Sequence, residues 1–308
     1  MDVHSTSLPK PDKGWRIWWQ LTRPHTLTAA FVPVLLGTAL AIQHKQIHLP
    51  LFAAMLIASL LIQAATNMFN EYYDYVRGLD NEKSVGIGGA IVRNGVKPGT
   101  VLGLGFAFFG IAVLLGVYIS ANSSWWIALI GTVSMAAGYL YTGGPYPIAY
   151  TPFGELAAGL FMGVVIVLIS FFIQTGSVTA ESILYSIPVS ILIGMIMLAN
   201  NIRDHDGDKE NGRKTIAILI GRKKAIVLLA IMFAISYAWV IGLIVFSSAT
   251  PWVLITFLSI PIAIKAVKGF IGKSEPVQML PAMKATAQTN TIFGFLLSIG
   301  LFIGYLLR

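Results

Sequence analysis

Long apolar runs, each separated from the next by a shorter polar stretch, cover most of this 308-residue chain. Nine of the runs have close to the roughly 20 residues that an α-helix needs to cross the hydrocarbon core of a bilayer. The pattern therefore predicts an all-α, polytopic membrane protein with about nine transmembrane helices. The predicted spans are 26–44, 51–71, 100–120, 124–142, 153–174, 182–202, 223–247, 250–268 and 287–307.

The chain begins differently. Residues 1–14 are polar, so we expect a disordered tail there and no cleavable signal, followed by a single transmembrane domain over 15–308. Trp15, Trp18 and Trp19 fall at helical spacing, which predicts a short helix lying in the membrane interface. An ordinary aromatic anchor explains these tryptophans better than a direct role in chemistry.

Composition agrees with the membrane assignment. The chain is 56% hydrophobic and 11% charged, with a mean hydropathy of +0.76. It contains no cysteine, which excludes disulfides, a cysteine nucleophile and a zinc knuckle.

The net charge of +8 does not imply a nucleic-acid partner, because the lysines and arginines lie in the polar stretches between apolar spans. If the N-terminus is cytoplasmic, all of the 21 Lys and Arg residues except Lys45 and Arg308 fall on the cytoplasmic side. The positive-inside rule thus predicts a protein of the cell (cytoplasmic) membrane with a cytoplasmic N-terminus and an external C-terminus.

The acidic residues are concentrated in two clusters. Eight of the 13 lie either between Glu71 and Glu82 or between Asp204 and Glu210, and each cluster closes an apolar run. Four predicted spans separate the two, so both clusters reach the same side of the membrane with the same polarity. We therefore expect a coarse internal repeat that builds one site from two halves.

Helical geometry supports a shared cation site. At roughly 100° per residue, Asn70 shares a helix face with Asp74, and Asp204 shares one with Asp208. Asp80 lies about 120° from Asp74 on the same reckoning, but a glycine such as Gly78 can end a helix and turn the chain back. Carboxylate and amide oxygens are preferred Mg²⁺ ligands. The expected metal ligands are Asn70, Asp74, Asp80, Asp204 and Asp208.

Other interpretations stay open at this stage. Each cluster could simply be a solvated helix end with an internal ion pair, such as Asp74 with Arg77. The glycine-rich stretch 86–95 could bring backbone amides to an anion, although it is not a P-loop. The stretch 141–147 is stiff and lacks Lys and Arg, so a rigid connector is a better default than a loop covering the site.

The spacing Asn70-x₃-Asp74-x₅-Asp80 with Asp204-x₃-Asp208 resembles the paired aspartate motifs of the UbiA-type intramembrane prenyltransferases. Arg23-Pro-His-Thr26, Tyr141-Thr-Gly-Gly-Pro145, Gly154-Glu155 and Asn200-Asn-Ile-Arg203-Asp204 agree with it. The resemblance implies a nine-helix enzyme, with a central cavity open to the cytoplasmic side, that moves an isoprenoid from its diphosphate to an aromatic acceptor using Mg²⁺. Glu71 departs from the family, in which many members have aspartate, and we do not expect it to be a ligand.

Within the family, the Asp74–Asp80 spacing and the loop through Arg93 look like the branch of menaquinone biosynthesis. Its partners would be polyprenyl diphosphate, 1,4-dihydroxy-2-naphthoate and the lipid bilayer; 4-hydroxybenzoate is the alternative acceptor. The resemblance implies two Mg²⁺ ions, one held by Asn70, Asp74 and Asp80 and the other by Asp204 and Asp208. Asp74, Asp80, Asp204 and Asp208 would be catalytic, and substrate contacts would come from Lys83, Arg93, Arg203, Lys209, Tyr139 and Asn201.

A membrane transporter is the rival class. Transporters place ionisable groups near the middle of the bilayer, whereas the spans here are nearly free of charged residues between their ends. That distribution favours a site at the cytoplasmic mouth. A structural scaffold would not need two clusters of oxygen ligands.

Overall fold

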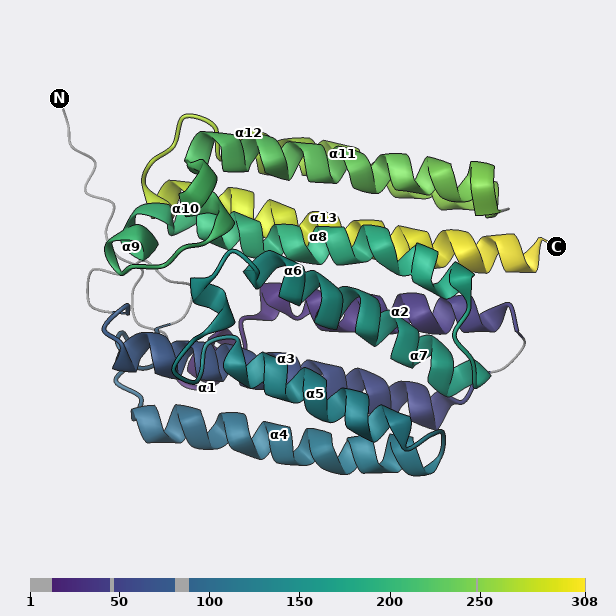
Figure 1. Cartoon of the computed structure of the whole chain (residues 1–308), viewed down its shortest axis with the longest axis horizontal. Coiled ribbons are helices and arrows are strands. Elements are labelled where there is room, and N and C mark those ends of the chain that lie inside the picture. Colours follow the sequence, from purple (N-terminus) through teal and green to yellow (C-terminus); the bar gives the residue numbers. More distant parts are fainter. Residues whose placement is uncertain (1–12, 45–46, 81–88, 248, 308) are drawn as a thin grey trace.

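The computed structural model describes residues 13–44, 47–80, 89–247 and 249–307, and the regular secondary structure within them is helical throughout. The long helices lie side by side in an elongated bundle, with α9 and α10 at one end and the C-terminus at the other (Figure 1). The elements are α1 Trp15–Leu21, η1 Pro24–Thr26, α2 Thr28–Ile42, α3 Leu49–Val76, α4 Pro98–Ala121, α5 Trp126–Leu140, η2 Ile148–Tyr150, α6 Gly154–Ala158, η3 Gly159–Val165, α7 Ile166–Thr175, α8 Ala180–Arg203, α9 His205–Glu210, α10 Ile216–Ile220, α11 Arg222–Ser247, η4 Pro251–Ser259, α12 Ile260–Lys268 and α13 Pro276–Leu306.

The helices reproduce most of the expected spans. Within the described residues, seven helical segments are long and apolar enough to cross a membrane, and an eighth is obtained if α1–η1 and α2, bent by 54°, count as one. The expected span 124–142 corresponds to α5, which has only 15 residues. The last span begins at Pro276 rather than at 287. An all-helical polytopic membrane fold is therefore confirmed, with seven to eight candidate spans.

The N-terminal tryptophans lie on a short helix, as predicted. Trp15, Trp18 and Trp19 are all exposed on α1, which packs against α3. Residues 1–12 of the expected tail lie outside the described residues.

Small residues let the long helices approach closely, as is usual between membrane helices. Gly37 of α2 lies against α7, where an added Cβ would come within 2.7 Å of the Cβ of Ser170. Gly159 of the π-helical segment η3 lies against α8, where an added Cβ would come within 2.8 Å of the carbonyl oxygen of Ser190. The resulting core is formed mainly by α2, α8, α11 and α13. These contacts fix α2 against α7 and η3 against α8.

The end of α3 is shaped by a glycine turn. Gly78 adopts the left-handed conformation, with φ of 74°, and the backbone N–H of Asp80 donates to the carbonyl of Asp74 at 3.1 Å. The chain therefore folds back after Gly78, as its sequence predicted, and Asp80 returns to the neighbourhood of Asp74.

The end of α8 differs in one respect from expectation. Asp204 and Asp208 were expected on the end of one continuous helix, but α8 stops at Arg203 and the shorter α9 starts at His205. Asp204 lies between them, at the C-cap position of α8 and the N-cap position of α9. The backbone N–H of Asp208 still donates to the carbonyl of Asp204 at 2.8 Å, so the two acids remain one helical turn apart on α9.

Candidate active site

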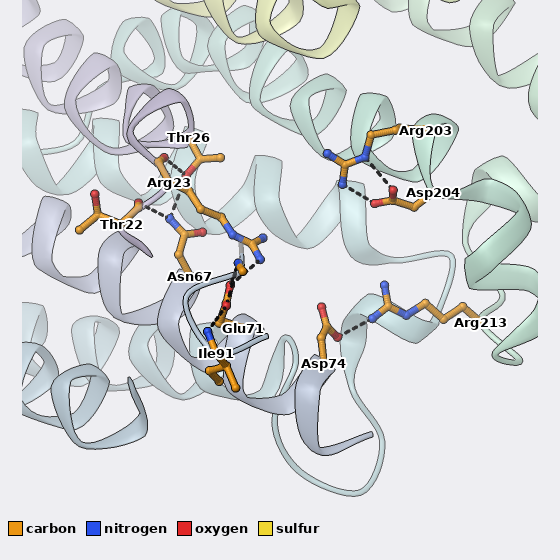
Figure 2. Close-up of polar contacts among 11 residues, drawn as sticks. Thr22, Arg23, Thr26, Asn67, Glu71, Asp74, Ile91, Arg203, Asp204 and Arg213 are labelled. Carbon is orange, nitrogen blue, oxygen red and sulfur yellow. Dashed lines mark hydrogen bonds and ion pairs between the residues drawn. The ribbon is translucent and has the colours of Figure 1, made fainter. Parts of the chain in front are cut away.

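The two acid clusters meet at one end of the bundle. They line a single polar cavity of about 470 Å³. Asp74, from the end of α3, and Asp204, after α8, project toward the same space (Figure 2). All five expected metal ligands lie on the cavity wall, namely Asn70, Asp74, Asp80, Asp204 and Asp208.

An arginine that sequence reasoning did not single out joins the two clusters. Arg213 Nη2 lies 2.7 Å from Asp74 Oδ1, and Arg213 Nη1 lies 3.0 Å from Asp208 Oδ1. Its guanidinium also stacks over the ring of Tyr150, at 4.8 Å from the centroid. Burial alone would lower the pKa of Arg213, but the two carboxylates outweigh burial and raise it.

The alternative of an internal pair between Asp74 and Arg77 is wrong. Arg77 turns instead to the stretch 141–147, donating to the carbonyls of Thr142 and of Gly144, the latter at 2.8 Å. These bonds tie the stretch to the end of α3, in agreement with its interpretation as a rigid connector.

The donor set fits a hard cation. Burial raises the pKa of Asp208 to about 7, with Arg213 opposing the shift and the nearby Asp204 and Asp74 adding to it. Asp208 Oδ2 is buried and has no hydrogen-bond partner. Among the described residues, no three acidic or histidine side chains already converge on one point. The guanidinium of Arg213 instead lies between Asp74 and Asp208 and supplies the positive charge that balances these two carboxylates.

A second buried arginine, Arg203, pairs with the neighbouring carboxylate of Asp204. The Nε of Arg203 donates to Asp204 Oδ1 at 2.7 Å (Figure 2). Its Nη1 lies 2.9 Å from the sulfur of Met283 on α13. Arg203 is buried and lines the polar cavity.

Arg23 borders the first cluster. It adopts φ of 49°, the left-handed region that side chains rarely occupy. Asn67 stabilises the backbone on both sides of Arg23, because its side-chain amide donates to the Thr22 carbonyl at 2.8 Å and to Thr26 Oγ1 at 2.9 Å (Figure 2). When the amide oxygen of Asn70 accepts from Arg23 Nη1 at 3.0 Å, the amide nitrogen of Asn70 donates to Asp74 Oδ2 at 2.6 Å. Arg23 therefore lies beside Asn70 and Glu71 and lines the polar cavity.

Glu71 has a separate task. Its buried carboxylate accepts hydrogen bonds from the backbone N–H of Gly89 at 2.8 Å and of Ile91 at 3.2 Å, and it lies 3.9 Å from Arg23 Nη2. These two amides of the glycine-rich stretch are therefore occupied by the protein itself. The remainder of that stretch up to residue 88 lies outside the described residues.

A second, apolar cavity of about 290 Å³ adjoins the polar one. Its wall is formed largely by aliphatic side chains of α3, α4, α5, η3 and α8. The two cavities share the wall residues Arg23, Thr26, Asn70, Tyr141, Met197 and Asn200. A charged head and an apolar tail of one molecule could thus lie on either side of this shared wall.

The sequence model of the UbiA prenyltransferase family matches residues 30–284. The chain belongs to this family. It is 63% identical to a Bacillus subtilis (strain 168) protein named 1,4-dihydroxy-2-naphthoate octaprenyltransferase, over 96% of both chains. It is 28% identical to the human UbiA prenyltransferase domain-containing protein 1, over 95% of this chain and 86% of the human one.

Solved UbiA structures share the fold. The apo UbiA homologue from Aeropyrum pernix K1 matches with a TM-score of 0.68 at 17% identity, covering 91% of this chain and 98% of that one. The UbiA homologue from Archaeoglobus fulgidus bound to GPP and Mg²⁺ matches with a TM-score of 0.61 at 16% identity, covering 92% and 99%. The expected family is confirmed.

Of the other expected site residues, Asn201 lines a cavity, whereas Tyr139 and Lys209 do not. Asn201 lines the polar cavity and donates to Glu155 Oε1 at 2.9 Å. Tyr139 lines neither cavity; its hydroxyl bonds that of Tyr73, and its ring packs on Phe69. Lys209 is exposed and lines neither cavity.

Two expected basic contacts remain. The guanidinium of Arg93 packs against Gly89, away from both cavities, and Lys83 lies outside the described residues. Sequence reasoning missed Arg213, Arg23 and Tyr150 as site residues. Arg23 lies in a segment that resembles the family, and Arg213 follows Asp208 by only five residues, so both carried a local signal.

Proposed function

We propose that this chain transfers a polyprenyl group from polyprenyl diphosphate to 1,4-dihydroxy-2-naphthoate. Diphosphate and CO₂ would be released, and the product would be the demethylmenaquinol of menaquinone biosynthesis. The observation that carries the proposal is the 63% identity, over 96% of both chains, to the Bacillus subtilis protein of that name. The site is compatible with the reaction, because an acid-lined cavity adjoins an apolar one.

The acid clusters would hold two Mg²⁺ ions. Asn70, Asp74 and Asp80 would bind one, and Asp204 and Asp208 the other. When bound, Mg²⁺ neutralises the diphosphate charge and makes it a better leaving group. Among the proposed basic contacts, Arg203 has the strongest support since it lines the polar cavity. Lys83, Arg93 and Lys209 would supply further positive charge for the diphosphate.

The bond changes would take place at the shared wall of the two cavities. The allylic C–O bond breaks, and its electron pair leaves with the diphosphate. The ring carbon that bears the carboxylate then bonds to the allylic carbon. The carbon–carboxylate bond breaks, CO₂ departs, and its electron pair restores the aromatic ring. That carbon loses CO₂ instead of a proton, so no general base is required there. Tyr141 and Asn200, which line both cavities, would border the reacting carbons, whereas Tyr139 is a weaker proposal because it packs elsewhere.

The membrane arrangement that fits this site has nine spans, with α2 counted by itself and α5 added to the seven longer segments. We place the N-terminus and the acid clusters in the cytoplasm and the C-terminus outside. The lysine and arginine distribution supports this orientation, and so does the position of the C-terminus at the opposite end of the bundle from α9 (Figure 1). The soluble acceptor would then enter from the cytoplasm and the tail from the bilayer.

The test uses purified protein in detergent with polyprenyl diphosphate, Mg²⁺ and 1,4-dihydroxy-2-naphthoate labelled in its carboxylate. We expect one labelled CO₂ for each prenyl group transferred, and no turnover after chelation of the metal. Efficient prenylation of 4-hydroxybenzoate with its carboxylate retained would instead favour that acceptor. Since detergent removes any gradient, failure to consume polyprenyl diphosphate with either acceptor would refute the transferase assignment and return the transporter to consideration.

A further inference from the structure

Arg213 is the cation shared by both acid clusters. Its guanidinium bridges Asp74 and Asp208 through two different nitrogens. The three side chains are only 12%, 14% and 9% exposed, so water screens their attraction weakly. The third nitrogen, Nε, is buried without a hydrogen-bond partner. The same oxygens that Arg213 binds are among those proposed to hold metal.

The backbone around Arg213 is anchored on both sides. The Arg213 N–H donates to the carbonyl of Asp208 at 3.0 Å, after a turn at Gly212 with φ of 77°. The next N–H, that of Lys214, donates to the carbonyl of Tyr150 at 2.9 Å. A change of partner at Arg213 therefore needs a movement of the side chain only, pivoting beside the Tyr150 ring on which it stacks.

The geometry sets up a competition. A cation that binds Asp74 and Asp208 must displace the guanidinium, which then loses two carboxylate partners in a poorly hydrated place. An arriving diphosphate offers it a replacement, because a guanidinium binds phosphate oxygens as readily as carboxylate oxygens. Arg213 therefore opposes the binding of metal when diphosphate is absent, but it does not oppose metal that binds together with diphosphate.

We propose that Arg213 couples the binding of metal to the binding of diphosphate. Without diphosphate it serves as an internal countercharge that holds Asp74 and Asp208; with diphosphate it transfers to the substrate's phosphate oxygens. This inference rests on the proposed prenyltransferase function. Because such coupling is reciprocal, Arg213 makes each of the two ligands strengthen the other.

The first experiment measures metal binding alone. Full-length protein in detergent is titrated with Mn²⁺ as the probe, without diphosphate, and free Mn²⁺ is followed by electron paramagnetic resonance. Removing the competing charge in Arg213→Gln should tighten Mn²⁺ binding on the order of tenfold, within the range typical of coupled sites. Lys214→Gln is the matched control, since it removes the neighbouring exposed charge that lines neither cavity, and it should bind Mn²⁺ like the parent protein. Equal or weaker Mn²⁺ binding by Arg213→Gln would overturn the proposal.

The second experiment measures how Arg213 affects the KM for polyprenyl diphosphate. At saturating Mg²⁺, Arg213→Gln should raise the KM for polyprenyl diphosphate by on the order of tenfold with a smaller effect on kcat. Arg213→Lys should recover most of that KM, because one ammonium can still bind a phosphate, and should bind Mn²⁺ more tightly than the parent, because it cannot bridge both carboxylates. If Arg213 were only a tie between α3 and α9, both variants would lower thermal stability and metal affinity together, which would refute the coupling.

The Mn²⁺ titration contains no substrate. A failure of the proposed reaction would therefore show as absent CO₂ release by the parent protein, independently of the Arg213 result.

Discussion

Replacing Glu71 by glutamine separates a structural carboxylate from the metal-binding ones beside it. The Glu71 side chain accepts hydrogen bonds from the backbone N–H groups of Gly89 and Ile91, and the residue is only 1% exposed. A hydrogen bond to a charged acceptor contributes roughly 1.5–3 kcal/mol. Both N–H groups donate to Oε1, and that of Gly89 also donates to Oε2 at 3.0 Å. Glutamine keeps an accepting oxygen in place of Oε1, but it loses the negative charge and presents an NH₂ group to the Gly89 N–H in place of Oε2. The anchor of residues 89–91 should therefore weaken by about 2 kcal/mol, which corresponds to about 30-fold more frequent local opening.

Hydrogen–deuterium exchange in detergent measures this directly, because it reports local opening of individual segments. In Glu71→Gln, the amides of Gly89 and Ile91 should lose about 30-fold in protection, while those in the centre of α8 stay unchanged. Glu181→Gln, in the first turn of α8, is the control and should leave both segments as they are. Mn²⁺ affinity should be the same in all three proteins.

Two results would contradict this reasoning. Unchanged exchange at Gly89 and Ile91 would show that the carboxylate does not anchor the segment. Unchanged exchange together with weaker Mn²⁺ binding would make Glu71 a ligand instead of an anchor.

The remaining predictions concern the metal site and the topology. Asp74→Asn and Asp208→Asn should each lower activity on the order of a hundredfold or more, because weaker Lewis-acid stabilisation costs several kcal/mol and each ~1.4 kcal/mol is tenfold in rate; steady-state kinetics over a range of Mg²⁺ concentrations checks this, and normal turnover would refute the site. Asp206→Asn should be much milder, since that carboxylate is 63% exposed and pairs with Arg222. A reporter fused after Arg308 should be external and one inserted in the loop 203–222 cytoplasmic; finding both on one side would mean that the number of spans is wrong by an odd number.

Most of the fold is encoded locally and could be predicted from the sequence. A run of about 20 apolar residues leaves the backbone no partner in lipid except itself, so it forms a helix whatever its neighbours are. The helical period alone placed Asn70 near Asp74, and the conformational freedom of Gly78 brought Asp80 back. The two clusters share one cavity, as their common polarity in the chain predicted. Limits appeared where local signals compete: α5 is short, and α8 breaks at Asp204.

The choice of partners for the charged groups was decided by the tertiary structure. Sequence proximity favoured Arg77 as the partner of Asp74, yet Arg213 is the partner, 139 residues away. Glu71 similarly binds two amides of the glycine-rich stretch, and Tyr139 turns to an aromatic cluster. The physical reason is that several cations lie within reach of each carboxylate along the chain. The one that pairs is selected by the tertiary packing that brings the segment after α9 to the end of α3, because burial makes the closest and least hydrated contact the strongest.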